Sequence, residues 1–256
     1  KGSYSISNGQ WGHVDPSPHG PEISLEYCVF DSVGYDGTCS PNLISVRSAH
    51  LFLNNCHFSN FYPLEIDRVI FCEMASIYDT PDERITIREC VFENLFLDAA
   101  PPIELRNPYG PFGEVRIESN EFRDVIFDGS SWDDGVLINL DSFAEGRITG
   151  NTGSGNTNTA FWIRGTGVAD GSMTLESSNE LPFLIGQITG AEGRTLTIEE
   201  GSVLKMSELM DEANFRVYGD MIADGAIFSS WEDDSVGGDN DLQPEPPSVG
   251  YWGSTN

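Results

Sequence analysis

Basic residues are scarce in this chain. Its 256 residues include 13 lysines and arginines against 41 aspartates and glutamates, which gives a formal net charge of −28. Lys1 and Lys205 are the only lysines. Because a surface this acidic repels phosphate groups, nucleic acids are not expected as partners, whereas divalent cations and neutral or cationic partners remain open. The same composition favours a secreted or cell-surface location.

Several sequence motifs are also missing. No apolar run reaches the roughly 20 residues that a membrane-spanning helix needs, so we expect no membrane span. There is no Cys-x-x-Cys pair for zinc or redox chemistry, no Gly-x-Ser-x-Gly and no phosphate-binding loop. Hydrophobic residues nevertheless make up 39% of the chain. That share predicts a packed core and excludes a disordered acidic segment.

Four segments of the chain share one pattern, in which apolar residues stand at every second position before a phenylalanine. The phenylalanines are Phe30, Phe58, Phe92 and Phe122, and the residues two places before them are Cys28, Cys56, Cys90 and Asn120. The steps between the phenylalanines are 28, 34 and 30 residues. Alternation of this kind indicates a strand with one buried face.

This repeat predicts the fold class. Units of about 30 residues with two or three short strands and no amphipathic helix exclude the helical repeat arrays. They predict an all-β fold, a right-handed parallel β-helix (β-solenoid) of about eight to nine rungs, in which equivalent side chains stack from rung to rung. We expect Cys28, Cys56 and Cys90 to form an internal ladder beside a stack of the four phenylalanines.

Two parts of the chain resemble known β-helix repeats. The segments Asn-Asn-Cys-His-Phe (54–58) and Arg-Glu-Cys-Val-Phe-Glu-Asn (88–94) resemble the repeat of pectate-lyase-like right-handed parallel β-helix proteins. The order of segments 196–205, 215–225, 226–234, 237–241 and 250–253 is similar to that of β-helix modules in large secreted and cell-surface proteins of bacteria and archaea.

We therefore interpret residues 1–256 as a single β-helix domain. Its expected parts are an N-terminal loop and strand over 1–20, degenerate repeats over 21–190, and a surface-protein-type module over 191–256.

The ends of the predicted coil show no capping helix, and the only helix-like stretch, 205–213, lies between strands. One explanation is that further rungs of a longer chain continue the coil. Another is that copies stack head to tail, with the rung of Tyr251, Trp252 and Gly253 meeting the next copy's first strand. A head-to-tail contact that does not close generates a filament. A cap built by the N-terminal loop is the third explanation.

An acidic loop over 232–241 is the candidate metal site. Calcium binds six to eight oxygen ligands, which clustered carboxylates without nearby basic residues supply. The candidate ligands are Asp233, Asp234, Asp239, Asn240 and Asp241. The alternative is a solvated surface loop without metal.

The five cysteines are an odd number, so at least one is unpaired or bonded to another chain. Cys39 lies in a turn and Cys72 follows about one rung later, so a disulfide between them is a candidate. We interpret the three ladder cysteines as buried thiols.

Two functions follow as hypotheses. The first is a non-catalytic structural β-solenoid of an extracellular surface protein, an adhesin or a filament subunit. The alternative is a polysaccharide lyase or glycoside hydrolase of the pectate-lyase-like class. No catalytic constellation is evident in the sequence, and His57 is expected to point outward. Trp132 and Trp231, in two similar acidic turns, are candidate platforms for glycans.

Overall fold

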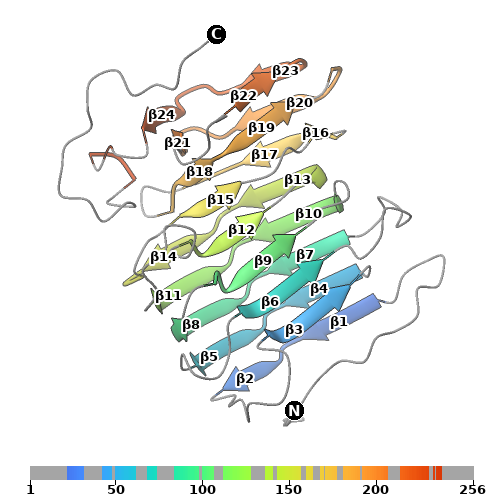
Figure 1. The fold of residues 1–256 in the computed structure, drawn as a ribbon, viewed down its shortest axis with the longest axis vertical. Coiled ribbons are helices and arrows are strands. Elements are labelled where there is room, and N and C mark those ends of the chain that lie inside the picture. The colour runs from blue at the N-terminus through green and yellow to red at the C-terminus, as the bar shows by residue number, and fades with distance from the viewer. Residues whose placement is uncertain are drawn as a thin grey trace.

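The structure is a computed structural model. It describes residues 22–31, 42–47, 50–61, 68–73, 84–97, 100–106, 112–127, 136–140, 143–156, 160–163, 168–169, 171–177, 181–190, 192–206, 214–230, 233 and 235–237. Within these ranges the chain forms strands β1 to β24 and no helix, and neighbouring strands in every sheet are parallel. The predicted all-β parallel β-helix is therefore confirmed (Figure 1).

Sheet A and sheet B form two sides of the coil. Sheet A contains, in spatial order, β1 (Glu22–Glu26), β4 (His50–Asn54), β7 (Arg84–Arg88), β10 (Phe112–Glu118), β13 (Phe143–Thr149), β17 (Met173–Leu175), β20 (Thr195–Ile198) and β23 (Asp220–Ile222). Sheet B contains β2 (Val29–Asp31), β5 (His57–Phe61), β8 (Val91–Leu97), β11 (Glu121–Phe127) and β14 (Thr152–Ser154).

Sheet C and sheet D complete the coil. Sheet C contains β3 (Asn42–Arg47), β6 (Arg68–Glu73), β9 (Ile103–Arg106), β12 (Ile138–Leu140), β15 (Phe161–Ile163), β18 (Phe183–Ile185), β21 (Val203–Met206) and β24 (Ile227–Ser230). Sheet D contains β16 (Val168–Ala169), β19 (Gln187–Gly190) and β22 (Asn214–Val217).

The path of the chain follows from the order of the strands. Each rung contributes one strand to sheet A and one to sheet C, and both sheets have eight strands among the described residues. In the first five rungs the third strand belongs to sheet B, and in the last three it belongs to sheet D. The cross-section of the coil therefore changes between β14 and β16, upstream of the expected boundary at residue 191.

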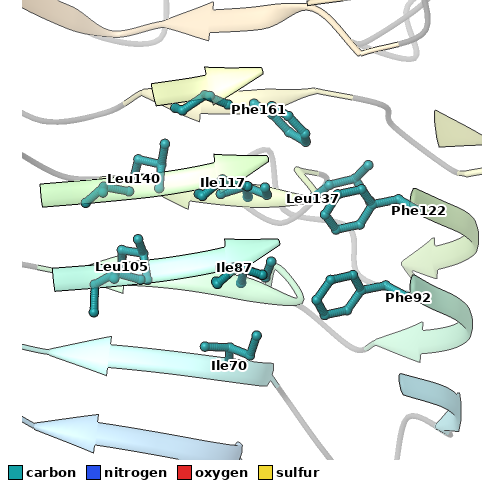
Figure 2. Close-up of a cluster of buried hydrophobic side chains, with 14 of the residues drawn as sticks. Ile70, Ile87, Phe92, Leu105, Ile117, Phe122, Leu137, Leu140 and Phe161 are labelled. Atoms are coloured by element: carbon teal, nitrogen blue, oxygen red, sulfur yellow. The ribbon is translucent and has the colours of Figure 1, made fainter. Parts of the chain in front are cut away.

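Stacked phenylalanines fill the core next to sheet B. Phe30, Phe58, Phe92 and Phe122 lie in register, and each successive pair of rings has centroids 4.9 Å apart and nearly parallel planes. Figure 2 shows Phe92 and Phe122 one above the other. Isoleucine and leucine columns from sheets A and C pack against this stack, as Ile87 under Ile117 and Leu105 under Leu140 show.

Left-handed residues form two columns at the corners of the coil. The first column, between sheets A and B, has φ from 52° to 66° and contains Tyr27, Asn55, Glu89, Ser119 and Gly150. The second, in or after the strands of sheet B, contains Asn60, Asn94, Asp124 and Gly155, with φ from 51° to 66°. Each such residue other than glycine costs about 1–2 kcal/mol of local strain. Packing and hydrogen bonding between successive rungs must therefore stabilise these bends.

The helix-like stretch 205–213 was interpreted wrongly at its start. Lys205 and Met206 belong to strand β21, in register with Leu184 and Ile185 of β18. Tertiary structure determines the conformation here, because the seventh rung contributes a strand to sheet C between β18 and β24. Residues 207–213 lie outside the described ranges.

Candidate functional site

Charged side chains on the outer faces of sheets A and B pair with their neighbours in adjacent rungs. Glu93 lies between His57 Nε2, 2.8 Å away, and Arg123 Nη2, 2.9 Å away. Arg147 Nε is 3.1 Å from Glu118 Oε1 on sheet A. Exposed pairs of this kind contribute little to stability, at most about 1 kcal/mol each. His57 points outward, as expected.

The internal ladder at the first corner contains amides as well as thiols. Cys56 and Cys90 are buried and Cys28 is half-buried. Above Cys90 the column continues with Asn120 and then Asn151, which are 1% and 5% exposed. Asn120 Oδ1 accepts a hydrogen bond of 3.0 Å from Cys90 N, and its Nδ2 donates to Ile87 O at 2.9 Å.

Asn151 repeats this arrangement one rung later. Its Oδ1 accepts hydrogen bonds of 3.0 Å from both the backbone N and the Nδ2 of Asn120, while its Nδ2 donates to Ile117 O at 2.8 Å. These amides satisfy backbone groups at the turn that would otherwise be buried without partners. The arrangement is structural.

The outer face of sheet C differs from the other faces because its central column is buried. In register along this column lie Phe71, Glu104, Asn139, Trp162, Leu184, Lys205 and Ser229. From Glu104 to Ser229 every member is at most 9% exposed. Trp162 and Leu184 belong to a second, small apolar cluster with Val136 and Ala160, apart from the main core. We call this set the sheet C column.

The lower half of the sheet C column carries polar chemistry. Arg68 forms an ion pair with Glu104, and its guanidinium lies 5.1 Å from the ring centroid of Phe71. Next above Glu104 is Asn139, which is 6% exposed and whose Oδ1 has no hydrogen-bond partner among the described residues. A buried carbonyl oxygen without a partner is unusual and marks a place where a ligand or a covering group is expected.

The upper half of the column ends beneath the start of the acidic loop. Lys205 is fully buried, and a Cβ on Gly237 would lie 3.1 Å from Lys205 Cε and 3.0 Å from Pro182 Cβ. The backbone at Gly237 therefore rests directly on the lysine side chain. Asp233 lies near enough for the ammonium of Lys205 to act on its charge.

Hydrogen bonds engage the carboxylate of Asp233. Ser229 donates from its hydroxyl to Oδ2, and Ser235 donates to Oδ1 from its backbone N at 3.1 Å and from Oγ at 2.5 Å. The bonds from Ser229 and then Ser235, and the Lys205 charge, lower the pKa of Asp233. This residue is thus held in its ionised form by the protein itself.

Of the predicted calcium ligands, only Asp233 lies among the described residues. Asp234, Asp239, Asn240 and Asp241 lie outside them. Within the described ranges no three His, Cys, Asp or Glu side chains are grouped to hold a metal ion. Calcium binding by the loop stays a prediction.

The remaining predicted sites are placed only in part. Cys72 of β6 is buried in a core column between Val46 and Leu105, and burial raises the pKa of its thiol. A bond to Cys39, which is outside the described ranges, stays a prediction. Also outside them are Trp132, Trp231, Tyr251, Trp252 and Gly253.

The sheet C column and Asn151 are the features that sequence reasoning missed. One available signal was the continuous apolar run in 160–163 and 183–185, which indicates a strand buried on both faces. The burial of Lys205 had no such signal, because it depends on where a distant loop crosses the sheet.

Compared with protein-family models, curated proteins and solved structures, the chain has no match in any of the three. In the part of the chain that is described, there is also no helix long and apolar enough to cross a membrane.

Proposed function

We propose that the chain is a non-catalytic structural β-solenoid of an extracellular surface protein, an adhesin or filament subunit, whose copies stack head to tail. The observation that carries this proposal is a single core column that reaches both ends of the described coil. It runs in register along sheet A through Ile23, Leu51, Ile85, Val115, Gly146, Met173, Leu196 and Met221.

The two ends of this column are the most open positions in it. Met221 in the last rung is 46% exposed, although it occupies an inward position. Ile23 in the first rung is only partly buried. Contact between the last rung of one copy and the first rung of the next would bring these two side chains together and continue the column.

Strand edges support the same contact. Among the described residues, β1 and β23 end sheet A, and β3 and β24 end sheet C. Edge strands present unpaired N–H and C=O groups that favour pairing with another strand. Sheets A and C both extend to the first and the last described rung, and all their strands are parallel. The contact between two copies would therefore pair β23 with β1 and β24 with β3. The contact is heterologous and does not close, so it produces a filament.

The test uses one substitution at each end. Met221→Glu blocks the last rung and Ile23→Glu blocks the first, because each places a negative charge where an apolar contact forms and the two charges repel each other. Wild-type protein should show fibres by electron microscopy and large species by sedimentation at high concentration with calcium. Each variant alone should be monomeric, and a mixture of the two should stop at dimers. Thr86→Glu, on the outer face of β7 in the third of the eight described rungs, is the matched control and should still assemble.

A wild-type chain that stays monomeric under these conditions would refute self-stacking. The scaffold function would then require further rungs of a longer chain at the same ends. Circular dichroism of each variant tests whether the rungs are intact, which separates a loss of assembly from a loss of folding.

A second candidate, a polysaccharide lyase or hydrolase of the pectate-lyase-like class, rests on the sheet C column. Arg68 and Glu104 bring a base and a carboxylate to one face beside the ring of Phe71, and Asn139 Oδ1 has no hydrogen-bond partner among the described residues. Turnover of uronic-acid polymers, with and without chelator, tests it. Product formation that Glu104→Gln abolishes and Glu118→Gln retains would support it, and the absence of product would remove it.

A further inference from the structure

Three cysteines occupy equivalent positions in successive rungs. Cys28, Cys56 and Cys90 each follow a strand of sheet A by two residues. The carbonyl of Cys28 accepts a hydrogen bond of 2.8 Å from His57 N, and that of Cys56 accepts one of 2.9 Å from Val91 N. Strands paired in this way lie about 4.8 Å apart. A disulfide requires Cα atoms about 4.4–6.8 Å apart, so neighbouring members of the ladder are placed for a bond.

Hydrogen bonds place the thiol of Cys56 next to the first rung. Cys56 Sγ donates to Leu25 O of β1 and to Asn54 O of its own rung, each at 3.5 Å. Cys28 Sγ donates to Glu26 O, close to Leu25 in the same strand, at 3.6 Å. Burial is the main cause that raises the pKa of Cys28, whereas the hydrogen bond from Cys90 is the main cause that lowers the pKa of Cys56.

Among the three ladder cysteines, Cys28 is the accessible one. Cys28 is half-exposed, whereas Cys56 and Cys90 are each 1% exposed. Beyond Cys90 the column is closed by Asn120, which binds the Cys90 backbone N–H. A small reagent therefore reaches Cys28 first and finds Cys56 directly behind it.

We infer that Cys28 and Cys56 form a redox-active pair that closes to a disulfide between the first and second rungs. The oxidant is a small-molecule disulfide. Cys28, the accessible thiol, gives its proton to solvent as its sulfur attacks one sulfur of the small disulfide. The released small thiolate takes up a proton, and a mixed disulfide is left on Cys28. The Cys56 thiolate then attacks the Cys28 sulfur and releases the second small thiol. The two cysteines lose two protons and two electrons, and the small disulfide gains them as two thiols.

Oxidised glutathione is the probe that tests this assignment. The full chain carrying Cys39→Ser and Cys72→Ala retains only the three ladder cysteines. After incubation in native buffer and an acid quench, trypsin separates Cys28 on peptide 2–47, Cys56 on 48–68 and Cys90 on 89–106. Mass spectrometry should find peptides 2–47 and 48–68 joined, with Cys90 recovered as a thiol.

Two further variants separate this pair from the other neighbours. Cys28→Ser should abolish the cross-link, while glutathione adducts at Cys56 and Cys90 stay low because both are buried. Cys90→Ala should retain the cross-link. Since Cys90→Ala alters the core, the mapping of the three-cysteine chain stands as the primary result if that variant does not fold.

Three results would overturn the inference. The first is a cross-link that joins Cys56 to Cys90. The second is a stable glutathione adduct on Cys28 without any cross-link. The third is a cross-link that appears only in denaturant, because it would reflect the unfolded chain. Because stacking of copies would cover the first rung and with it Cys28, the assay uses chains that also carry Met221→Glu, so that its outcome does not depend on self-stacking.

Discussion

Asn120 donates a hydrogen bond of 3.0 Å from Nδ2 to Oδ1 of Asn151, which lies one rung away in the same internal column. Both side chains are buried, and both also bind backbone groups of neighbouring strands. Below them the column is made of thiols, which bind backbone carbonyls only weakly, at 3.3–3.6 Å. The amides therefore hold the first corner of the coil more firmly than the cysteines do.

Replacing Asn120 with alanine should lower the free energy of unfolding by about 3 kcal/mol or more, because Cys90 N and Ile87 O lose their partners and each unsatisfied buried group costs about 1–3 kcal/mol. Denaturant unfolding followed by circular dichroism measures the change. Asn54→Ala is the control, since its hydrogen bond of 3.2 Å to Glu26 is exposed. Equal losses for the two variants would contradict a special role of the internal amides.

Two glycines with positive φ, Gly155 in the second left-handed column and Gly193 outside both columns, should differ in their tolerance of alanine. A Cβ on Gly155 would lie 2.2 Å from Asp124 Oδ1, whereas a Cβ on Gly193 would meet no atom within 4 Å, and both residues have positive φ. Gly193→Ala should therefore cost only the strain of the backbone, about 1–2 kcal/mol. Gly155→Ala should cost more, because Asp124 must also move. Thermal unfolding of the two variants measures the difference. Equal decreases in the unfolding midpoint would show that the Asp124 side chain moves aside at no cost.

The sequence predicted the cysteine and phenylalanine columns because their period is set by stacking itself. It did not predict where the columns end. Gly153 stands in register with Phe122, so the phenylalanine column stops there. A Cβ at Gly153 would lie 2.7 Å from Leu181 Cδ2. Leu181, from a later rung, therefore occupies the space of the missing ring. Because the replacing residue is distant in the sequence, the residues around Gly153 give no sign of it.

The sheet C column was harder to predict for a different reason. Alternation of apolar and polar residues shows which face of a strand is inward, but it does not show whether the outward face is covered. Lys205 illustrates this limit, because a lysine in a strand suggests solvent. Its buried side chain lies against Gly237, more than 30 residues later in the chain.

Phe92 lies between Phe58 and Phe122 in the ring stack and is fully buried. Its replacement with alanine should lower the free energy of unfolding by about 3–5 kcal/mol, because the lost ring leaves a cavity in a close-packed column. Phe52→Ala, on the half-exposed outer face of sheet A, is the matched control and should cost far less. Urea unfolding measures both, and a similar cost for Phe52 would contradict the assignment of inner and outer faces.

The pKa of Asp233 is lowered in the folded chain, chiefly by the hydrogen bond from Ser229. Its contribution to stability is thus complete above the unfolded pKa of an aspartate, about 4, and is lost as pH falls through the lower folded value. Asp233→Asn should therefore be less stable than wild type near neutral pH, and the difference should shrink in acid. Asp220→Asn, which removes one exposed charge, is the control. A gap that does not depend on pH would contradict this account.

Calcium binding by the loop over 232–241 leads to a last expectation, which the contacts of Asp233 sharpen. If the loop binds calcium, the ion should raise the thermal unfolding midpoint, and a chelator should reverse the rise by mass action. Asp239→Asn and Asp241→Asn should each weaken this response. Asp233→Asn should retain it, because Ser229 and Ser235 already engage that carboxylate. If Asp233→Asn loses the response to calcium, Asp233 is itself a calcium ligand. If calcium does not change the wild-type unfolding midpoint, the loop does not bind the ion, and Lys205 is the cation that neutralises the start of the loop.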